Sequence, residues 1–113
     1  MPAKSPKPMS VLVALYHHPK DAGAFERYYE VTHMPIVTRH LRTLGIRETI
    51  FMKFTGAVDG SRPQYYRKAE LWFDSDEART KAMGMPGFGE IAGDIPNFAT
   101  GGVTILLGER TNG

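Results

Sequence analysis

The chain has 113 residues, enough for one domain with a single hydrophobic core and too few for two. Its composition, 42% hydrophobic and 23% charged with no long apolar run, predicts a soluble globular domain and excludes a membrane-spanning helix. A net charge of +2 is too small for a nucleic-acid-binding surface, and the lack of cysteine excludes disulfides and thiolate metal sites and fits a cytoplasmic location.

The chain opens with a polar segment, MPAKSPKP, followed by an apolar one. Because proline and lysine dominate residues 1–8, we expect a disordered tail there and a folded domain over residues 9–113. The apolar stretch ends in two histidines and has no small-residue cleavage site, so a secretion signal is not expected. Its length and its content of valine and leucine instead predict a first strand over residues 9–16.

A helix is predicted next, capped by Asp21 and ended by Gly45. Pro35 removes a backbone donor inside it, which predicts a kink or break near residues 31–35. At the helical spacing, one face collects these side chains: Ala22, Phe25, Tyr29, His33, Ile36, Val37, His40 and Leu44.

Two segments with alternating or β-favouring residues, 46–54 and 64–73, predict an antiparallel pair of strands. A second helix is expected over residues 74–83, with Asp74 or Ser75 as its cap.

The segment 84–102 is rich in glycine and proline, so we expect only a short turn near residues 90–92 rather than a long helix. A last strand follows over residues 103–109.

The order strand, helix, strand, strand, helix, strand predicts an α+β fold, the ferredoxin-like βαββαβ sandwich. Two helices can cover only one face of such a sheet, yet the first strand is apolar on both faces. We therefore expect a homodimer in which two sheets stack face to face.

His33 is the leading catalytic candidate because it lies on the inward helix face beside a proline, one turn from Tyr29. A neutral imidazole there could transfer a proton, with Tyr29 as its hydrogen-bond partner. Tyr29 would orient the substrate or stabilise developing negative charge. The structural alternative is a buried histidine bonded to a neighbouring carbonyl, or a cap to the kink.

No metal site is expected. His33 and His40 are seven residues apart, roughly 10 Å along a helix, which is too far to share one ion. The adjacent His17 and His18 are interpreted as turn residues. A haem with His33 or His40 as axial ligand is a minor alternative to a site without a cofactor.

Aromatic side chains could line a pocket for a small apolar or aromatic molecule, although core packing is the commoner role for each. The polar residues of GDIPNF, Asp94 and Asn97, are explained equally well by turn formation. The candidate substrate-binding residues are Tyr16, Phe25, Tyr28, Trp72 and Phe98.

Four segments, ALYHHP, FERYYEVTHMPIV, AELWFDSDEA and GDIPNF, resemble the EthD family over about residues 9–109. The resemblance implies a dimeric α+β barrel with a pocket between sheet and helices toward which His33 projects. That superfamily includes cofactor-independent monooxygenases, isomerases, cyclases and haem enzymes, so the fold does not select the reaction.

The resemblance and the residues together predict a protein that acts on a small, largely apolar organic metabolite in a catabolic or secondary-metabolic route. In this hypothesis the protein is a cofactor-independent oxidoreductase, or a lyase or isomerase, with His33 as acid/base. The alternative is a non-catalytic accessory protein that binds small molecules for an oxygenase system. A third interpretation assigns only structural roles to every polar residue.

Overall fold

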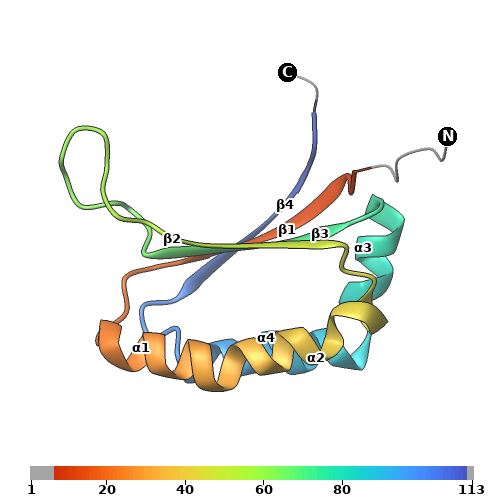
Figure 1. Ribbon diagram of the computed structural model, residues 1–113, viewed down its shortest axis with the longest axis horizontal. Helices are drawn as coiled ribbons and strands as arrows, with labels where there is room; N and C mark the ends of the chain where they lie inside the picture. The colour runs from red at the N-terminus through yellow and green to blue at the C-terminus, as the bar shows by residue number, and fades with distance from the viewer. Residues whose placement is uncertain (1–6, 112–113) are drawn as a thin grey trace, which may run out of the picture.

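The computed structural model describes residues 7–111 and shows one four-stranded antiparallel sheet with helices against one face (Figure 1). Residues 1–6 of the predicted tail lie outside the described residues. The strands lie in the spatial order β2-β3-β1-β4, which confirms the ferredoxin-like fold. Their bounds are β1 Ser10–Tyr16, β2 Glu48–Lys53, β3 Arg67–Phe73 and β4 Val103–Glu109.

The first helical segment is continuous across Pro35 and consists of α1 (Ala22–Tyr28), the π-helical turn η1 (Tyr29–His33) and α2 (Met34–Leu44) (Figure 1). The Met34 N–H bonds to the Tyr29 carbonyl, five residues back, and Pro35, which has no N–H to donate, follows directly, so this wide turn accommodates the proline. The predicted kink or break is therefore a single wide turn that contains His33.

Capping residues mark the ends of the helices. Asp21 accepts a hydrogen bond from the Ala24 N–H at 3.0 Å, and Gly45 ends α2 with a φ of 74°, a left-handed conformation that favours glycine. Ser75, rather than Asp74, caps α3 (Asp76–Met83). No helix within residues 7–111 has the length and apolar character to cross a membrane.

The segment after α3 forms a complete helix, α4 (Pro86–Asp94), followed by the short 3₁₀ turn η2 (Ile95–Asn97). The prediction of only a short turn was wrong because a glycine here serves helix packing. A Cβ on Gly87 would lie 2.7 Å from Nδ1 of His40, so glycine lets α4 pack closely against α2. Pro86 occupies the first turn, where proline is tolerated.

The core lies between the sheet and the helices and forms two clusters. One surrounds α2, α4 and the centre of the sheet, and the other is aromatic and surrounds η1 and the end of β1. The first contains Leu12, Val37, Leu44, Leu71, Phe73, Ala82 and Ile91; the second contains Ala14, Tyr16, Phe25, Tyr29, Ala69, Phe98 and Ala99.

No described helix covers the other face of the sheet, which we call the open face (Figure 1). Ile50, Met52 and Leu106 are 37%, 42% and 51% exposed there, and Val13 and Leu15 of β1 alternate with helix-facing residues. The expected apolar character of both faces of the first strand is therefore confirmed.

Trp72 also lies on the open face, because Leu71 and Phe73 on either side of it face the helices. Its Nε1 donates to Glu70 at 2.8 Å, and the Arg110 guanidinium lies 4.5 Å from its ring centre. Trp72, a candidate substrate-binding residue, therefore lies on the opposite face of the sheet from the helices.

Candidate functional site

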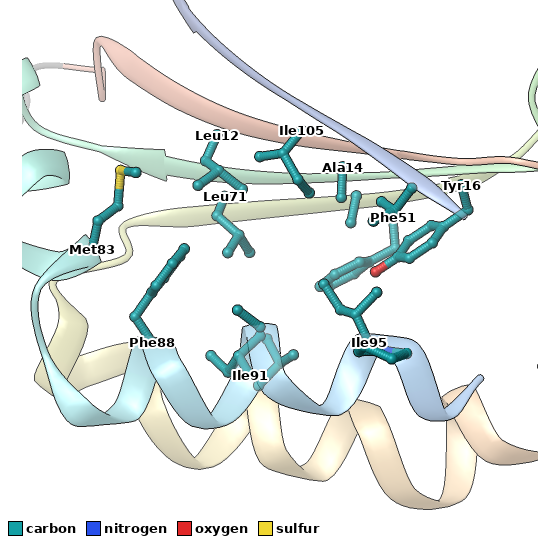
Figure 2. Close-up of a pocket in the computed structure, with 15 residues that line it drawn as sticks. Leu12, Ala14, Tyr16, Phe51, Leu71, Met83, Phe88, Ile91, Ile95 and Ile105 are labelled. Carbon is teal, nitrogen blue, oxygen red and sulfur yellow. The ribbon is translucent and has the colours of Figure 1, made fainter. Parts of the chain in front are cut away.

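A cavity of about 340 Å³ lies between the sheet and the helices α2 and α4 (Figure 2). Its floor is one row across the sheet, in which Phe51 of β2 pairs with Ala69, Ala69 with Ala14, and Ala14 with Ile105 of β4. Because the two central residues are alanines, the row leaves free space where larger side chains would meet the helices.

Helix α4 and its neighbours line the opposite side of the cavity. Phe88 and Ile91 of α4 and Ile95 of η2 point toward the sheet, and Met83 lies at one end (Figure 2). Apart from one tyrosine, every lining side chain is a hydrocarbon or a methionine thioether. The cavity therefore suits an apolar molecule.

The exception is Tyr16, whose hydroxyl points into the cavity (Figure 2). Its side chain is 2% exposed, and its ring makes edge contacts with Phe25 and Tyr29 at centroid distances of 5.5 and 5.9 Å. Burial, helped by the neighbouring Tyr29, raises the pKa of Tyr16 well above its ordinary range. The phenol therefore keeps its proton.

A second polar site surrounds the buried carboxylate of Asp94. Its Oδ2 lies 2.9 Å from Nδ1 of His33, and its Oδ1 accepts from the Tyr28 hydroxyl at 2.6 Å and from Asn97 Nδ2 at 3.0 Å. Burial opposes ionisation, but hydrogen bonds from Tyr28, Asn97 and His33 together lower the pKa of Asp94 below its ordinary value. An ionised carboxylate only accepts, so we assign the imidazole proton to Nδ1.

His33 is a buried, neutral histidine. It is 3% exposed, and burial lowers its pKa below the ordinary value even though Asp94 opposes this. Its ring stacks on Tyr29 at 5.7 Å and packs against Phe98 at 4.5 Å. With Nδ1 protonated, Nε2 carries the lone pair and could accept a proton.

Two expectations for His33 need correction. Its hydrogen-bond partner is Asp94, not Tyr29, since Tyr29 packs ring to ring and its hydroxyl is buried without a partner among the described residues. His33 also does not line the apolar cavity. It lies on the same helix face as Val37, which does, but Tyr29 and Phe98 pack against its ring.

The other predicted site residues divide between the cavity and its aromatic surroundings. Tyr16 lines the cavity, whereas Phe25 and Phe98 belong to the aromatic cluster and Tyr28 packs against that cluster. The alanines of the floor were missed because no motif marks them. Asp94 was explained by turn formation. Its position in GDIPNF, a segment that resembles the EthD family, was the signal available in the sequence for a role in the site.

A shallower groove of about 260 Å³ lies on the far side of Phe51. The Arg67 guanidinium lies 4.6 Å from the Tyr29 ring centre, and one of its nitrogens is 3.3 Å from Glu26 Oε1. The groove is lined by Glu26, Tyr29, Glu30, Met34, Phe51 and Arg67.

Within residues 7–111, no three His, Cys, Asp or Glu side chains are placed to hold a metal ion. For the haem alternative, Nδ1 of His33 is engaged by Asp94, and Nε2 of His40 lies 2.7 Å from Glu90 Oε2. Neither histidine lines the apolar cavity. Ligation of a haem therefore stays a prediction that a visible absorption spectrum tests.

Comparison with known proteins adds a family to this geometry. The sequence model described as the EthD domain matches residues 17–102. An uncharacterised 11.0 kDa protein from the thcB–thcC intergenic region of Rhodococcus erythropolis is 34% identical over 93 residues, which span 82% of this chain and 86% of that protein.

Solved structures agree with this match. An EthD family protein from Bacillus halodurans is 30% identical, with a TM-score of 0.81 over 91% of this chain and 99% of that one. A dimeric ferredoxin-like protein of unknown function from Jannaschia has a TM-score of 0.69 over 90% of this chain and 99% of that one, at 17% identity. At that identity the second likeness shows the fold alone.

Proposed function

The chain belongs to the EthD domain family, and on that premise we propose that it binds a small, largely apolar organic molecule in the cavity between sheet and helices. The observation that carries the proposal is the hydrocarbon lining of a space of about 340 Å³. Burial of apolar surface releases about 25 cal/mol per Å², so such a lining favours apolar ligands. Ligand pockets span about 300–1,000 Å³, which makes this a site for a small molecule.

A cavity-filling variant tests the proposal. Ala14 lies at the centre of the floor, so Ala14→Leu should occupy the space with little strain and exclude a ligand. We expect saturating ethylbenzene to raise the melting temperature of the wild type but not that of Ala14→Leu. Ala24→Leu, on the exposed side of α1, is the matched control and should respond like the wild type. Equal responses from all three proteins would contradict the proposal.

A second candidate function is proton transfer by His33, which the contact with Asp94 favours. In this candidate Asp94 holds the Nδ1 proton and leaves Nε2 as a base, in the oxidoreductase-linked catabolic role that the family resemblance implies. Tyr29 and Phe98 would have to move for a ligand in the cavity to reach His33. Binding without catalysis needs no such movement and is therefore the leading function.

The two candidate functions predict different effects of His33→Gln on the turnover of a compound that the wild type converts. If His33 transfers a proton, the variant should bind ethylbenzene as tightly as the wild type and lose turnover. Full turnover in a folded His33→Gln protein would rule out the acid/base role.

We also infer that the protein is a homodimer through the open face. The exposed apolar side chains there include Ile50, Met52 and Leu106, while Lys68 and Glu70 neutralise each other at 2.8 Å. A second copy of this chain presents the same neutral, apolar face. The dimeric ferredoxin-like relative from Jannaschia shares this fold.

Two adjacent leucines of β4 allow a controlled test of the dimer. Leu106 on the open face and Leu107 on the helix side are 51% and 52% exposed. We expect Leu106→Asp to convert the dimer to a monomer in sedimentation velocity experiments and Leu107→Asp to leave it dimeric. A monomeric wild type, or a dimeric Leu106→Asp protein, would contradict this interface.

A further inference from the structure

One polar group faces the apolar cavity. Among the residues that line it, Tyr16 alone has a side-chain oxygen or nitrogen, and the hydroxyl is directed into the space (Figure 2). The other end of the cavity, near Met83 and Phe88, is apolar. A ligand would therefore meet a hydrogen-bonding group at one place only.

Aromatic rings surround the Tyr16 side chain, and its hydroxyl faces the cavity (Figure 2). A ligand that displaces water from this hydroxyl must supply an acceptor in its place, because a hydroxyl left unpaired away from water is unfavourable. Because burial raises the pKa of Tyr16, the group presents an O–H rather than a phenolate. It is therefore a donor that a bound ligand would meet.

Two further donors lie near Tyr16 but outside the cavity. Tyr16 pairs with Arg67 across β1 and β3, and Arg67 stacks on the ring of Tyr29. The Tyr29 hydroxyl and Arg67 Nε are buried without partners among the described residues. The nearby carboxylate, Glu26, already accepts from Arg67 and from Tyr66. Neither Arg67 nor Tyr29 lines the cavity, so the Tyr16 hydroxyl is the donor that an acceptor oxygen would meet there.

We propose that the ligand is a neutral molecule with an apolar body and one acceptor oxygen, such as a ketone, which accepts a hydrogen bond from the Tyr16 hydroxyl. The proposal rests on the binding function above and specifies its ligand class. An ionised carboxylate is excluded because one neutral donor cannot replace its hydration. A cation is excluded because no carboxylate lines the cavity.

Acetophenone and ethylbenzene test this proposal because they differ mainly by a carbonyl in place of a methylene. The variant Tyr16→Phe removes only the hydroxyl, and Tyr65→Phe, outside the cavity, is the control. By calorimetry we expect Tyr16→Phe to weaken acetophenone binding by about 3- to 10-fold, the range of one neutral hydrogen bond. Ethylbenzene binding should stay equal or become tighter, and Tyr65→Phe should change neither.

The outcomes separate this proposal from the binding function. If wild type binds neither compound, both are overturned. If both bind and Tyr16→Phe weakens neither, or both equally, the cavity stands and the acceptor proposal is overturned. If the Tyr16→Phe protein fails to fold, a measurement on the wild type alone still tests the proposal. The infrared carbonyl stretch of bound acetophenone should lie below its frequency in hexane, and a hexane-like frequency would overturn the proposal.

Discussion

The contact between Asp94 and His33 makes a sharp prediction for Asp94→Asn, which replaces one carboxylate oxygen by an amide nitrogen at nearly constant shape. Tyr28 and Asn97 both donate to Oδ1, whereas His33 alone faces Oδ2. The amide oxygen should therefore stay with the two donors and the amide nitrogen should face His33. Nδ1 of His33 must then accept, so its proton moves to Nε2.

The energetic consequence follows from the same contacts. The variant loses a hydrogen bond to a charged acceptor at a histidine that is 3% exposed, worth about 1.5–3 kcal/mol, and gains a neutral one worth about 0.5–1.5 kcal/mol. We expect the free energy of unfolding to fall by about 1–2 kcal/mol in urea denaturation at pH 7. Asp59→Asn, in an exposed loop, is the control and should change stability less, because the amide oxygen can keep both hydrogen bonds that Ser61 donates to Oδ1.

Nitrogen-15 NMR of the imidazole rings reads the tautomer directly. The wild type should show His33 protonated at Nδ1, and Asp94→Asn should show it protonated at Nε2. An unchanged tautomer together with unchanged stability would refute the assignment of Asp94 as the group that orients His33.

Two further predictions concern pH and helix packing. The pKa of His33 is lowered below its ordinary 6.5, so as pH falls below about 6.5 the unfolded chain takes up a proton that the folded chain does not. The free energy of unfolding should then fall, by at most about 1.4 kcal/mol per pH unit, until the folded pKa is passed. In urea titrations, His33→Gln should remove this slope. An identical slope in the variant would contradict the assignment of the slope to His33. Gly87→Ala should lower the free energy of unfolding by about 1 kcal/mol because its Cβ would lie 2.7 Å from Nδ1 of His40. Gly89→Ala is the control: a Cβ there would have nothing within 4 Å, so this variant should raise the free energy of unfolding by about 0.5–1 kcal/mol. Equal effects of the two alanines in thermal denaturation would contradict the packing of α4 on α2.

The fold could be predicted because its local signals agree with its tertiary arrangement. The alternation in β2, the caps Asp21 and Ser75, and Gly45 after α2 each act through neighbouring residues. Helix α4 was missed because its glycines disfavour a helix locally, although one of them, Gly87, allows close packing against α2. That packing depends on His40, some fifty residues earlier in the chain, and no local pattern reports it.

The candidate site was predicted less completely. Helical spacing placed His33 on the inward face, but its partner Asp94 lies 61 positions away in the chain, and spacing cannot pair such residues. Trp72 was misplaced because composition identifies aromatic residues without saying which face of a strand they occupy. The cavity itself results from two alanines that are neighbours only in the sheet register.

The central claim, that a small apolar molecule occupies the space above Ala14, is tested most directly by methyl NMR of the wild type titrated with ethylbenzene. We predict shifts for methyl groups that line the cavity, including Leu71, Ile91 and Ile105, and none for Leu106 on the open face. Shifts confined to the open face, or no shifts at saturation, would contradict the claim.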